Sequence, residues 1–278
     1  MLRAVALGAL IVALCSSTAG TEPQDTVDRA GRLMVDAVRL FEQGRYREAL
    51  APAREALGVL ERIQGPDHPD VALSLNVLGQ TLRETGHHVE ARAVHERALR
   101  IRETTLGPNH PDVAWSLSNL AAVHWVVGNY ASARPLFERA LRIREAILGP
   151  NHPDLAASLN NLAVLLRAMG EYAEARRLYE RAVRIAEVAL GPEHPHVGQA
   201  LHNLAQLLGT MGDYANARPL AERALRITEA GLGPNHPEVA QRLDNLASLL
   251  HAVADDAAAT PLLARALRIA EAALGPKS

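Results

Sequence analysis

The sequence predicts an all-α fold, a solenoid of six antiparallel helix pairs stacked in line. Three observations carry this prediction. The hexapeptide GPNHPD begins at Gly107 and returns at Gly149, and looser copies repeat at the same spacing of 42 residues along the chain. Apolar residues recur at helical spacing within each interval. The composition is 48% hydrophobic but only 3% aromatic, which suits close-packed helices better than sheets.

Each interval holds two helices, and the interval 150–191 shows how. The apolar stripe of the first helix, called the A helix, consists of Leu159, Leu162, Ala163 and Leu166. The stripe of the second, called the B helix, consists of Ala175, Leu178, Tyr179, Ala182 and Ile185. Because Gly170 ends the A helix and the B helix starts after Tyr172, the turn is short and the two helices must be antiparallel.

Residues 27–275 are predicted to form a single solenoid domain, preceded by a short segment, 20–26, and followed by a tail, 276–278. Its units are approximately 24–65, 66–107, 108–149, 150–191, 192–233 and 234–275. One helix pair cannot bury both of its faces, but a stack can. Small residues at one position of the A helix indicate where helices approach closely, and these are Ala37, Gly79, Ala121, Ala163, Ala205 and Ala247.

The GPNHPD motif is explained by helix boundaries. Gly107 suits a left-handed residue that ends the B helix, and Pro108 prevents its continuation. Pro111 suits the first turn of the next A helix, Asp112 complements the helix dipole, and His110 falls at or near the cap. The equivalent histidines are His68, His110, His152, His194 and His236. A shared metal site is the alternative, but equivalent points lie roughly 10 Å apart, whereas zinc ligands lie about 2 Å from the ion.

The first 19 residues have the pattern of a secretory signal peptide. Arg3 precedes an apolar run from Ala4 to Leu14, and small residues follow. The run is shorter than the ~20 residues that a membrane-spanning helix needs, so we expect an exported protein, periplasmic or extracellular, without an integral membrane span. Cys15 is the only cysteine, and a lipid anchor on it is a minority alternative. If the signal is removed beyond it, the mature protein has no disulfide.

The stretch from Ser158 to Ile185, SLNNLAVLLRAMGEYAEARRLYERAVRI, is similar to the consensus of the tetratricopeptide repeat, in the long 42-residue form of kinesin light chains. The resemblance covers nearly all of the mature chain. It departs at the ends, where Asp36 replaces the usual leucine and Ala254 replaces the glycine of the turn between the helices. The resemblance implies a right-handed superhelix whose concave wall, made by the A helices, holds an extended peptide or a partner helix.

Candidate groove residues follow from this resemblance. Family members grip ligand backbone with an asparagine column, which this sequence matches at Asn119, Asn161, Asn203 and Asn245, whereas Val35 and Val77 break it. An amide both donates and accepts, so it suits any peptide main chain. The alternative is that these asparagines only hydrate the groove. The slots that bind a chaperone's terminal carboxylate in some relatives do not match here, so that ligand is not predicted.

Trp115 and Trp125 are the only tryptophans and lie on one A helix, which makes them candidate anchors for a ligand. Core filling is the alternative. We expect an apolar pocket here, near Leu73 and Val77, that grades into a polar trough. The complete set of predicted groove residues is Asn76, Trp115, Ser118, Asn119, Trp125, Asn160, Asn161, Gln199, His202, Asn203, Gln241 and Asn245.

The charged residues indicate a solvated outer surface. Each B helix is expected to hold a favourable i, i+4 pair, namely Glu96–Arg100, Glu138–Arg142, Glu180–Arg184 and Glu222–Arg226. The arginine column Arg139, Arg181 and Arg223 could suggest a polyanion stripe, but glutamates alternate with it. With a net charge of −2 and no basic patch, nucleic acid is not expected as a partner.

The sequence therefore predicts a non-enzymatic scaffold that binds a protein or peptide ligand in the groove. We find no phosphate-binding loop, no HExxH and no GxSxG, so no catalytic residue, cofactor or metal is expected. The alternative is a structural or assembly element that acts through its C-terminal end face or its convex surface, with no groove ligand. The end face would expose Leu262, Leu263, Leu267 and Ile269, and end-to-end homo-oligomers are possible.

Overall fold

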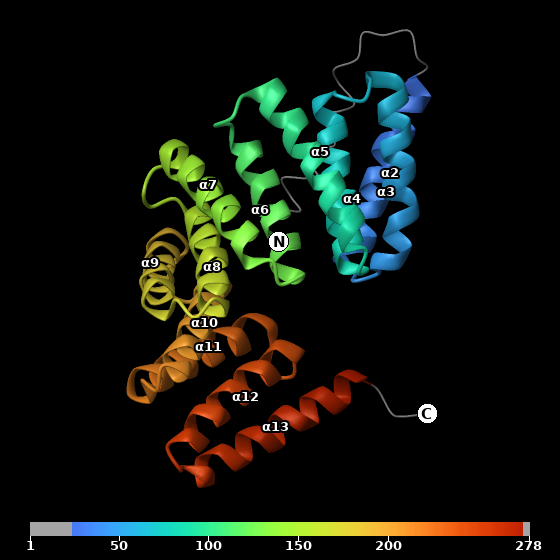
Figure 1. The fold of residues 1–278 in the computed structure, drawn as a ribbon. Coiled ribbons are helices and arrows are strands. Elements are labelled where there is room, and N and C mark those ends of the chain that lie inside the picture. The colour runs from blue at the N-terminus through green and yellow to red at the C-terminus, as the bar shows by residue number, and fades with distance from the viewer. Residues whose placement is uncertain (1–23, 275–278) are drawn as a thin grey trace. The chain divides into compact units, whose positions relative to one another are not determined.

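The computed structural model describes residues 24–274, which form twelve α-helices and no strand (Figure 1). The A helices are α2 (Gln24–Glu42), α4 (Pro69–Glu84), α6 (Pro111–Val126), α8 (Pro153–Ala168), α10 (Pro195–Thr210) and α12 (Pro237–Ala252). The B helices are α3 (Tyr46–Gln64), α5 (His88–Leu106), α7 (Tyr130–Leu148), α9 (Tyr172–Leu190), α11 (Tyr214–Leu232) and α13 (Asp256–Leu274). The predicted signal peptide, Cys15 and the tail lie outside the described residues.

The helices pack as repeated antiparallel pairs. Within a pair, α4 contacts α5, α8 contacts α9, and α10 contacts α11; between pairs, α5 contacts α6, α9 contacts α10, and α11 contacts α12. Successive A helices such as α4 and α6 also touch. The predicted all-α helical-repeat fold is therefore confirmed for the described part of the chain.

The chain divides into two compact units, the first ending at Ile143 and the second beginning at Arg144, so the boundary falls inside α7. In the first unit, two clusters of buried side chains join α2, α3, α4 and α5, and the first of them also includes Val123 of α6. A third cluster joins Val113 and Leu117 of α6 to Ala140 and Ile143 of α7. In the second unit, Leu159, Ala163, Leu201 and Ala205 are at most 1% exposed.

The histidines of the repeated hexapeptide cap the A helices. In α6, Nδ1 of His110 accepts a hydrogen bond at 3.2 Å from the backbone N–H of Asp112, and Pro111 begins the helix. The same bond is made by His68, His152, His194 and His236. A histidine nitrogen here does what a serine or asparagine oxygen usually does at an N-cap. The predicted role of the histidines in local turns and caps is confirmed.

The glycines after the five B helices α3 to α11 have a positive φ, but the conformation of Gly107 is not the left-handed helical one that we predicted. Its φ is 85° and its ψ is 158°, and Gly65, Gly191 and Gly233 are similar. A proline follows each of these glycines, and its ring excludes the helical range of ψ for the residue before it. The resulting combination of positive φ and extended ψ is essentially restricted to glycine.

Each A helix ends in a Schellman motif. In α6 the N–H of Gly128 bonds to the carbonyl of Trp125, and the N–H of Asn129 bonds to the carbonyl of His124. In the last pair, Ala254 replaces this glycine, as the sequence showed. It keeps the same bonds with φ at 59°, the only positive φ among the non-glycine residues described. The atypical turn is therefore formed, with an alanine in a strained conformation.

Gly79 makes room for a buried histidine. Its five equivalents are all alanines that are at most 1% exposed, namely Ala37, Ala121, Ala163, Ala205 and Ala247. A Cβ at Gly79 would lie 2.5 Å from Nε2 of His95, on the neighbouring helix α5. His95 is completely buried. The glycine in this small-residue column is therefore required by one bulkier neighbour.

Replacing Ala254 with glycine should stabilise the C-terminal helix pair by about 0.5–1 kcal/mol, because glycine removes the left-handed strain at some cost in unfolded-state entropy. Urea denaturation of the two proteins would measure the difference. The matched control, Ala264→Gly in the exposed part of α13, should instead destabilise by about 1 kcal/mol. Equal losses of stability in both variants would contradict this explanation of the turn.

Candidate binding surface

In the first unit, several predicted groove residues form one buried hydrogen-bond network centred on Asn76. Asn76 Oδ1 lies 3.0 Å from Nδ1 of His95 and 3.5 Å from Nδ2 of Asn119. Asn76 Nδ2 donates to the Ser116 hydroxyl at 3.2 Å and to the Ala72 carbonyl at 3.1 Å. Asn76 is fully buried, so its amide holds α4, α5 and α6 together and does not face solvent.

Trp115 covers a buried arginine in the same network. Arg102 is 3% exposed, and one of its amino groups donates to the Ser116 hydroxyl and to the Asp112 carbonyl, each at 3.0 Å. Its guanidinium lies 4.7 Å from the centre of the Trp115 ring, a cation–π contact. Burial lowers the pKa of Arg102 to about 10. Trp115 is half-buried and packs on the apolar core cluster that contains Leu73 and Val77. This contact matches the alternative of core filling, and the apolar ligand pocket stays a prediction.

In the second unit, the predicted residues form a chain of amides across three A helices. Asn203 Nδ2 donates to Asn160 Oδ1 at 2.8 Å, and Gln199 Nε2 donates to Asn203 Oδ1 at 3.2 Å. The Arg242 guanidinium then donates to Gln199 Oε1 at 2.6 Å. The chain therefore runs from α8 through α10 to α12.

The remaining predicted residues of this unit differ in exposure and in whether their side chains make hydrogen bonds. Asn245 Nδ2 lies 3.5 Å from Nδ1 of His202, which is 6% exposed. Asn161 is half-buried and Gln241 is exposed, and neither side chain makes a hydrogen bond within the described residues. Asn161 is thus the member of the asparagine column whose amide is most available to a ligand.

Two buried histidines near these residues are held neutral. Burial, with a contribution from the positive charges of Arg83 and Arg102, lowers the pKa of His95 to about 3. Burial, with the positive charges of Arg242 and Arg167, lowers the pKa of His202 to about 3. Neither histidine is charged at neutral pH, so both act as neutral hydrogen-bonding groups.

Comparison with known proteins agrees with the repeated helix pairs. The sequence profile of the tetratricopeptide repeat matches residues 37–104, 88–146, 112–187, 154–230 and 197–272. The chain belongs to the tetratricopeptide-repeat family. Membership of this family indicates a scaffold for protein–protein interaction in general. No curated protein sequence matches the chain.

Solved structures with the same fold include other tetratricopeptide-repeat proteins. BtubC (BKLC) from P. vanneervenii is 23% identical with a TM-score of 0.67, over 90% of this chain and 94% of that one. A putative kinesin light chain with nearly identical repeats from Podosopora anserina is 26% identical with a TM-score of 0.64, over 76% of this chain and 98% of that one. Aspartyl phosphate phosphatase F from Bacillus subtilis is 13% identical with a TM-score of 0.63, over 89% and 72%.

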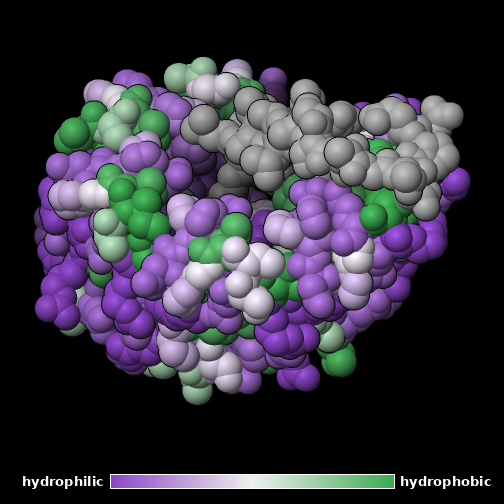
Figure 2. Space-filling model, turned by 90° about the horizontal axis from the view of Figure 1, so that it is seen from above, coloured by the Kyte–Doolittle hydropathy of each residue, from purple (hydrophilic) through white to green (hydrophobic). Residues whose placement is uncertain are grey.

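The two tryptophans occupy different environments within this tetratricopeptide-repeat unit. Trp115 packs on the core, whereas Trp125 is 39% exposed near the end of α6 and is followed by the exposed Val126 and Val127. Ser118 is buried, and its hydroxyl donates to the Ala114 carbonyl of its own helix. Figure 2 shows a face that is mostly hydrophilic, with small separate hydrophobic groups. Trp125 is therefore the more accessible of the two candidate anchors.

The predicted ion pairs within the B helices are wrong. Each glutamate pairs with the arginine four residues before it, giving Arg92–Glu96, Arg134–Glu138, Arg176–Glu180 and Arg218–Glu222. The arginine that precedes each glutamate lies on the face of the B helix toward the next repeat, as the contacts of Arg176 with Asp213 and of Arg218 with Asp255 indicate. Because the glutamate pairs with this arginine, it is oriented away from the arginine four residues after it. Spacing within one helix could not show this competition.

A ladder of ion pairs joins successive B helices, and the sequence reading missed it. Arg139, Arg181 and Arg223 bind Glu103, Glu145 and Glu187 of the preceding repeat, and Arg97 and Arg265 do the same with Glu61 and Glu229. Most of these arginines also donate to a carbonyl of the Gly-Pro turn, as Arg139 does to Pro108. The column is neutralised, so the interpretation as a polyanion stripe is not supported.

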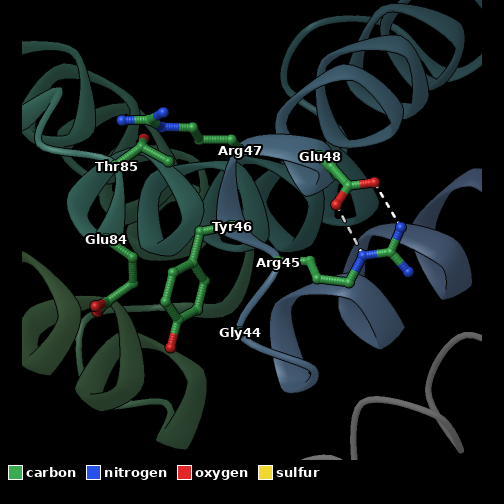
Figure 3. Close-up of a pocket in the computed structure, with 7 residues that line it drawn as sticks. All are labelled: Gly44, Arg45, Tyr46, Arg47, Glu48, Glu84 and Thr85. Carbon is green, nitrogen blue, oxygen red and sulfur yellow. Dashed lines mark hydrogen bonds and ion pairs between the residues drawn. The ribbon is translucent and has the colours of Figure 1, made fainter. Parts of the chain in front are cut away.

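A surface pocket of about 380 Å³ lies away from the predicted groove residues, in the first unit (Figure 3). Its lining residues are Gly44, Arg45, Tyr46, Arg47, Glu48, Glu84 and Thr85. Arg45 and Glu48 form a paired contact at 2.8 and 2.5 Å, and Glu84 pairs with Arg83, so most of the surrounding charge is neutralised. No sequence pattern marks this pocket, because its walls come from turns of two repeats.

Sequence reasoning also missed the buried arginines Arg102 and Arg242. A signal exists in the register of the repeat: a B-helix position and the A-helix position 14 residues later form the pairs Arg102 with Ser116, Arg144 with Ser158, and Thr228 with Arg242. The arginine reaches the serine in the first two pairs. In these two pairs a long cationic side chain and a small hydroxyl group are hydrogen-bonded to each other. Among residues 24–274, no three His, Cys, Asp or Glu side chains gather as metal ligands would, and no helix has the length and apolar character to cross a membrane.

The free energy of unfolding should fall as the pH drops from 6.5 towards 3. In this window the unfolded chain takes up protons at His95 and His202, while the folded chain keeps both neutral because their pKa values are about 3. Each histidine should therefore cost roughly 1.4 kcal/mol per pH unit below 6.5. Denaturant unfolding at several pH values would measure the slope.

His202→Asn is the matched variant, because asparagine stands at the equivalent positions Asn76 and Asn160. It should remove the share of the slope that belongs to one histidine while leaving stability at neutral pH nearly unchanged. A slope identical to that of the wild type would show that His202 is not held neutral in the folded chain.

Proposed function

We propose that this protein is a non-enzymatic scaffold that binds an extended, uncharged peptide segment along the A helices. The observation that carries this proposal is the distribution of charge. Between their first and last turns, α4, α6, α8 and α10 contain no aspartate, glutamate, lysine or arginine, whereas every B helix from α3 to α11 carries several. The A helices offer amides and apolar groups in their place.

The residues on these helices suit different ligand groups in each of the two units. Trp125, with Val126 and Val127, offers exposed apolar surface to a large side chain. Asn161 offers a free donor and a free acceptor to a main chain. Because little charge is involved, affinity should depend on hydrogen bonds and apolar contact, and selection by charge is weak.

Peptide binding can be tested with a display library of short unstructured peptides on the immobilised full chain. Asn161→Ala should weaken binding of selected peptides by about fivefold without loss of stability, since one net hydrogen bond is removed. Trp125→Ala should abolish capture, and Trp115→Leu, which copies Leu73, should reduce it while preserving the fold. Binding should change little up to about 0.5 M NaCl.

The control is Arg184→Ala on the outer surface of α9, where an exposed arginine has no ion pair with any residue that the structure describes. This variant should bind like the wild type. If the selected peptides bind all four variants as tightly as they bind the wild type, or if salt releases them, the A helices do not form the binding surface.

A second function, assembly through α13, is favoured by its exposed leucines. Leu263 and Leu267 are 48% and 59% exposed, whereas their equivalents Tyr179 and Val183 are 0% and 8% exposed. Leu262 is half-buried. The expectation that Ile269 belongs to this surface is wrong, because this side chain is buried, at 4% exposed.

If α13 pairs with a second copy, we propose that it meets another α13. The corresponding face of α2 carries Arg32, Asp36 and Arg39, all exposed, where α4 has the buried Ser74, Leu78 and Thr81. Burying these charges against leucine would be costly. The wild type should therefore form a concentration-dependent dimer in sedimentation equilibrium. The double variant Leu263→Ser, Leu267→Ser should abolish the dimer, whereas the control Val188→Ser should not. A wild type that stays monomeric at high concentration would reject assembly.

Export of the chain also stays a proposal, supported by Arg3 and the apolar run from Ala4 to Leu14. N-terminal sequencing of the protein from its producing cells would test it. A mature chain that starts near residue 20 is expected, and a lipid on Cys15 would indicate the alternative anchor. An intact Met1 would contradict export.

A further inference from the structure

The side-chain amide of Gln199 is held between two neighbouring A helices. Its Nε2 donates at 3.2 Å to Oδ1 of Asn203, on its own helix α10. Its Oε1 accepts at 2.6 Å from the guanidinium of Arg242, on α12. One amide group thus has its donor and its acceptor both satisfied by the protein surface, as a bound peptide group would.

The two groups that hold this amide are fixed in orientation. Nδ2 of Asn203 donates to Oδ1 of Asn160 at 2.8 Å, so the Asn203 oxygen is left facing Gln199 and requires a donor. Arg242 is 3% exposed, so its guanidinium is confined and presents a donor. Its Nε is buried without a partner, and its one carboxylate contact, with Glu238, is 3.5 Å long. Arg242 is therefore short of acceptors.

Gln199 itself is free to leave. Its side chain is exposed, in contrast to the buried Arg242 below it. The repeat does not require a bonded glutamine at this position, because the equivalent Gln241 makes no hydrogen bond within residues 24–274 and the equivalent Ala157 has no polar group. In the first unit the same position holds Trp115, which covers Arg102.

We propose that the carboxamide of Gln199 occupies an amide-binding site, and that an amide of a bound peptide displaces it to contact Asn203 and Arg242. The site rests on the proposed peptide-binding function and specifies its chemistry in the second unit. The ligand group is a main-chain peptide group or the carboxamide of an asparagine or glutamine. Either source supplies the N–H and the C=O that the site requires.

A carboxylate fits this site less well than an amide, despite the arginine. It has no hydrogen to give to Oδ1 of Asn203, whose orientation Asn160 holds. Glu238, half exposed at 3.5 Å from the Arg242 guanidinium, and Asp244, exposed on the same helix, would repel it. The site therefore selects a neutral amide over an acidic group.

The test uses the full chain labelled with ¹⁵N and three acetylated, amidated pentapeptides. One is all glycine, one has a central glutamine and one has a central glutamate. NMR titration follows the Arg242 Nε–H and the side-chain amide of Asn203. We expect both signals to shift with the glutamine peptide and to shift less with the glutamate peptide. An equal response to the all-glycine peptide would identify the main chain as the source of the amide, and a weaker one would identify the side chain.

The decisive variant is Gln199→Ala, which removes the internal competitor without disturbing the core, since Gln199 is exposed and alanine favours a helix. It should bind the glutamine peptide about threefold to tenfold more tightly than the wild type, the value of one hydrogen bond. Gln241→Ala, the matched control one repeat later, should bind like the wild type.

Three results would overturn the proposal. They are weaker binding by the Gln199 variant, an equal gain in the Gln241 variant, and a preference for the glutamate peptide. If the peptides shift only signals of Asn119, Trp115 or Trp125, the amide site is wrong while the proposed function stands. If no signal on any A helix shifts, both fail.

Discussion

Neighbour-to-neighbour burial is the constraint on which the structure depends. A single helix pair has apolar residues on both sides and can hide only one of them within itself. The core clusters accordingly include residues from three or more successive helices, as where Met34, Ala53, Leu78 and Val123 meet. Small residues such as Ala121 set the distance between the layers, and where His95 needs space, Gly79 replaces the alanine. Stability is therefore distributed over repeated contacts.

The buried polar groups of this stack also combine a large side chain with a small neighbour. Arg102 with Ser116 and Arg144 with Ser158 each place one long cationic side chain against one small hydroxyl group between neighbouring helix pairs, and Thr228 and Arg242 have the same spacing in the sequence. A guanidinium buried without a full carboxylate partner is costly unless its donors are used. These arginines use serine hydroxyls, backbone carbonyls, the Trp115 ring and the Gln199 amide, which brings them beside the predicted groove residues.

The helices, turns and caps could be predicted from the sequence, whereas much of the candidate surface could not. A stripe of apolar residues or a Gly-Pro dipeptide acts on its own few neighbours, so the boundaries of α8 and α9 and the capping role of His110 followed from local rules. The ion pairs of Glu96 and Glu138 were predicted wrongly because arginines four residues earlier compete for them. The engagement of Asn76 and Asn203, and the freedom of Asn161, depend on side chains about 40 residues away.

By itself, the sequence determined the all-α repeat, its period, the family and the column of asparagines, because each is expressed in a spacing that recurs along the chain. The tertiary structure decided which members of that column are buried and bonded, which tryptophan is accessible, and which arginines lie inside. It also placed the Gln199 amide between Asn203 and Arg242. Those outcomes depend on contacts between neighbouring repeats, where a single larger or smaller residue changes which groups can meet.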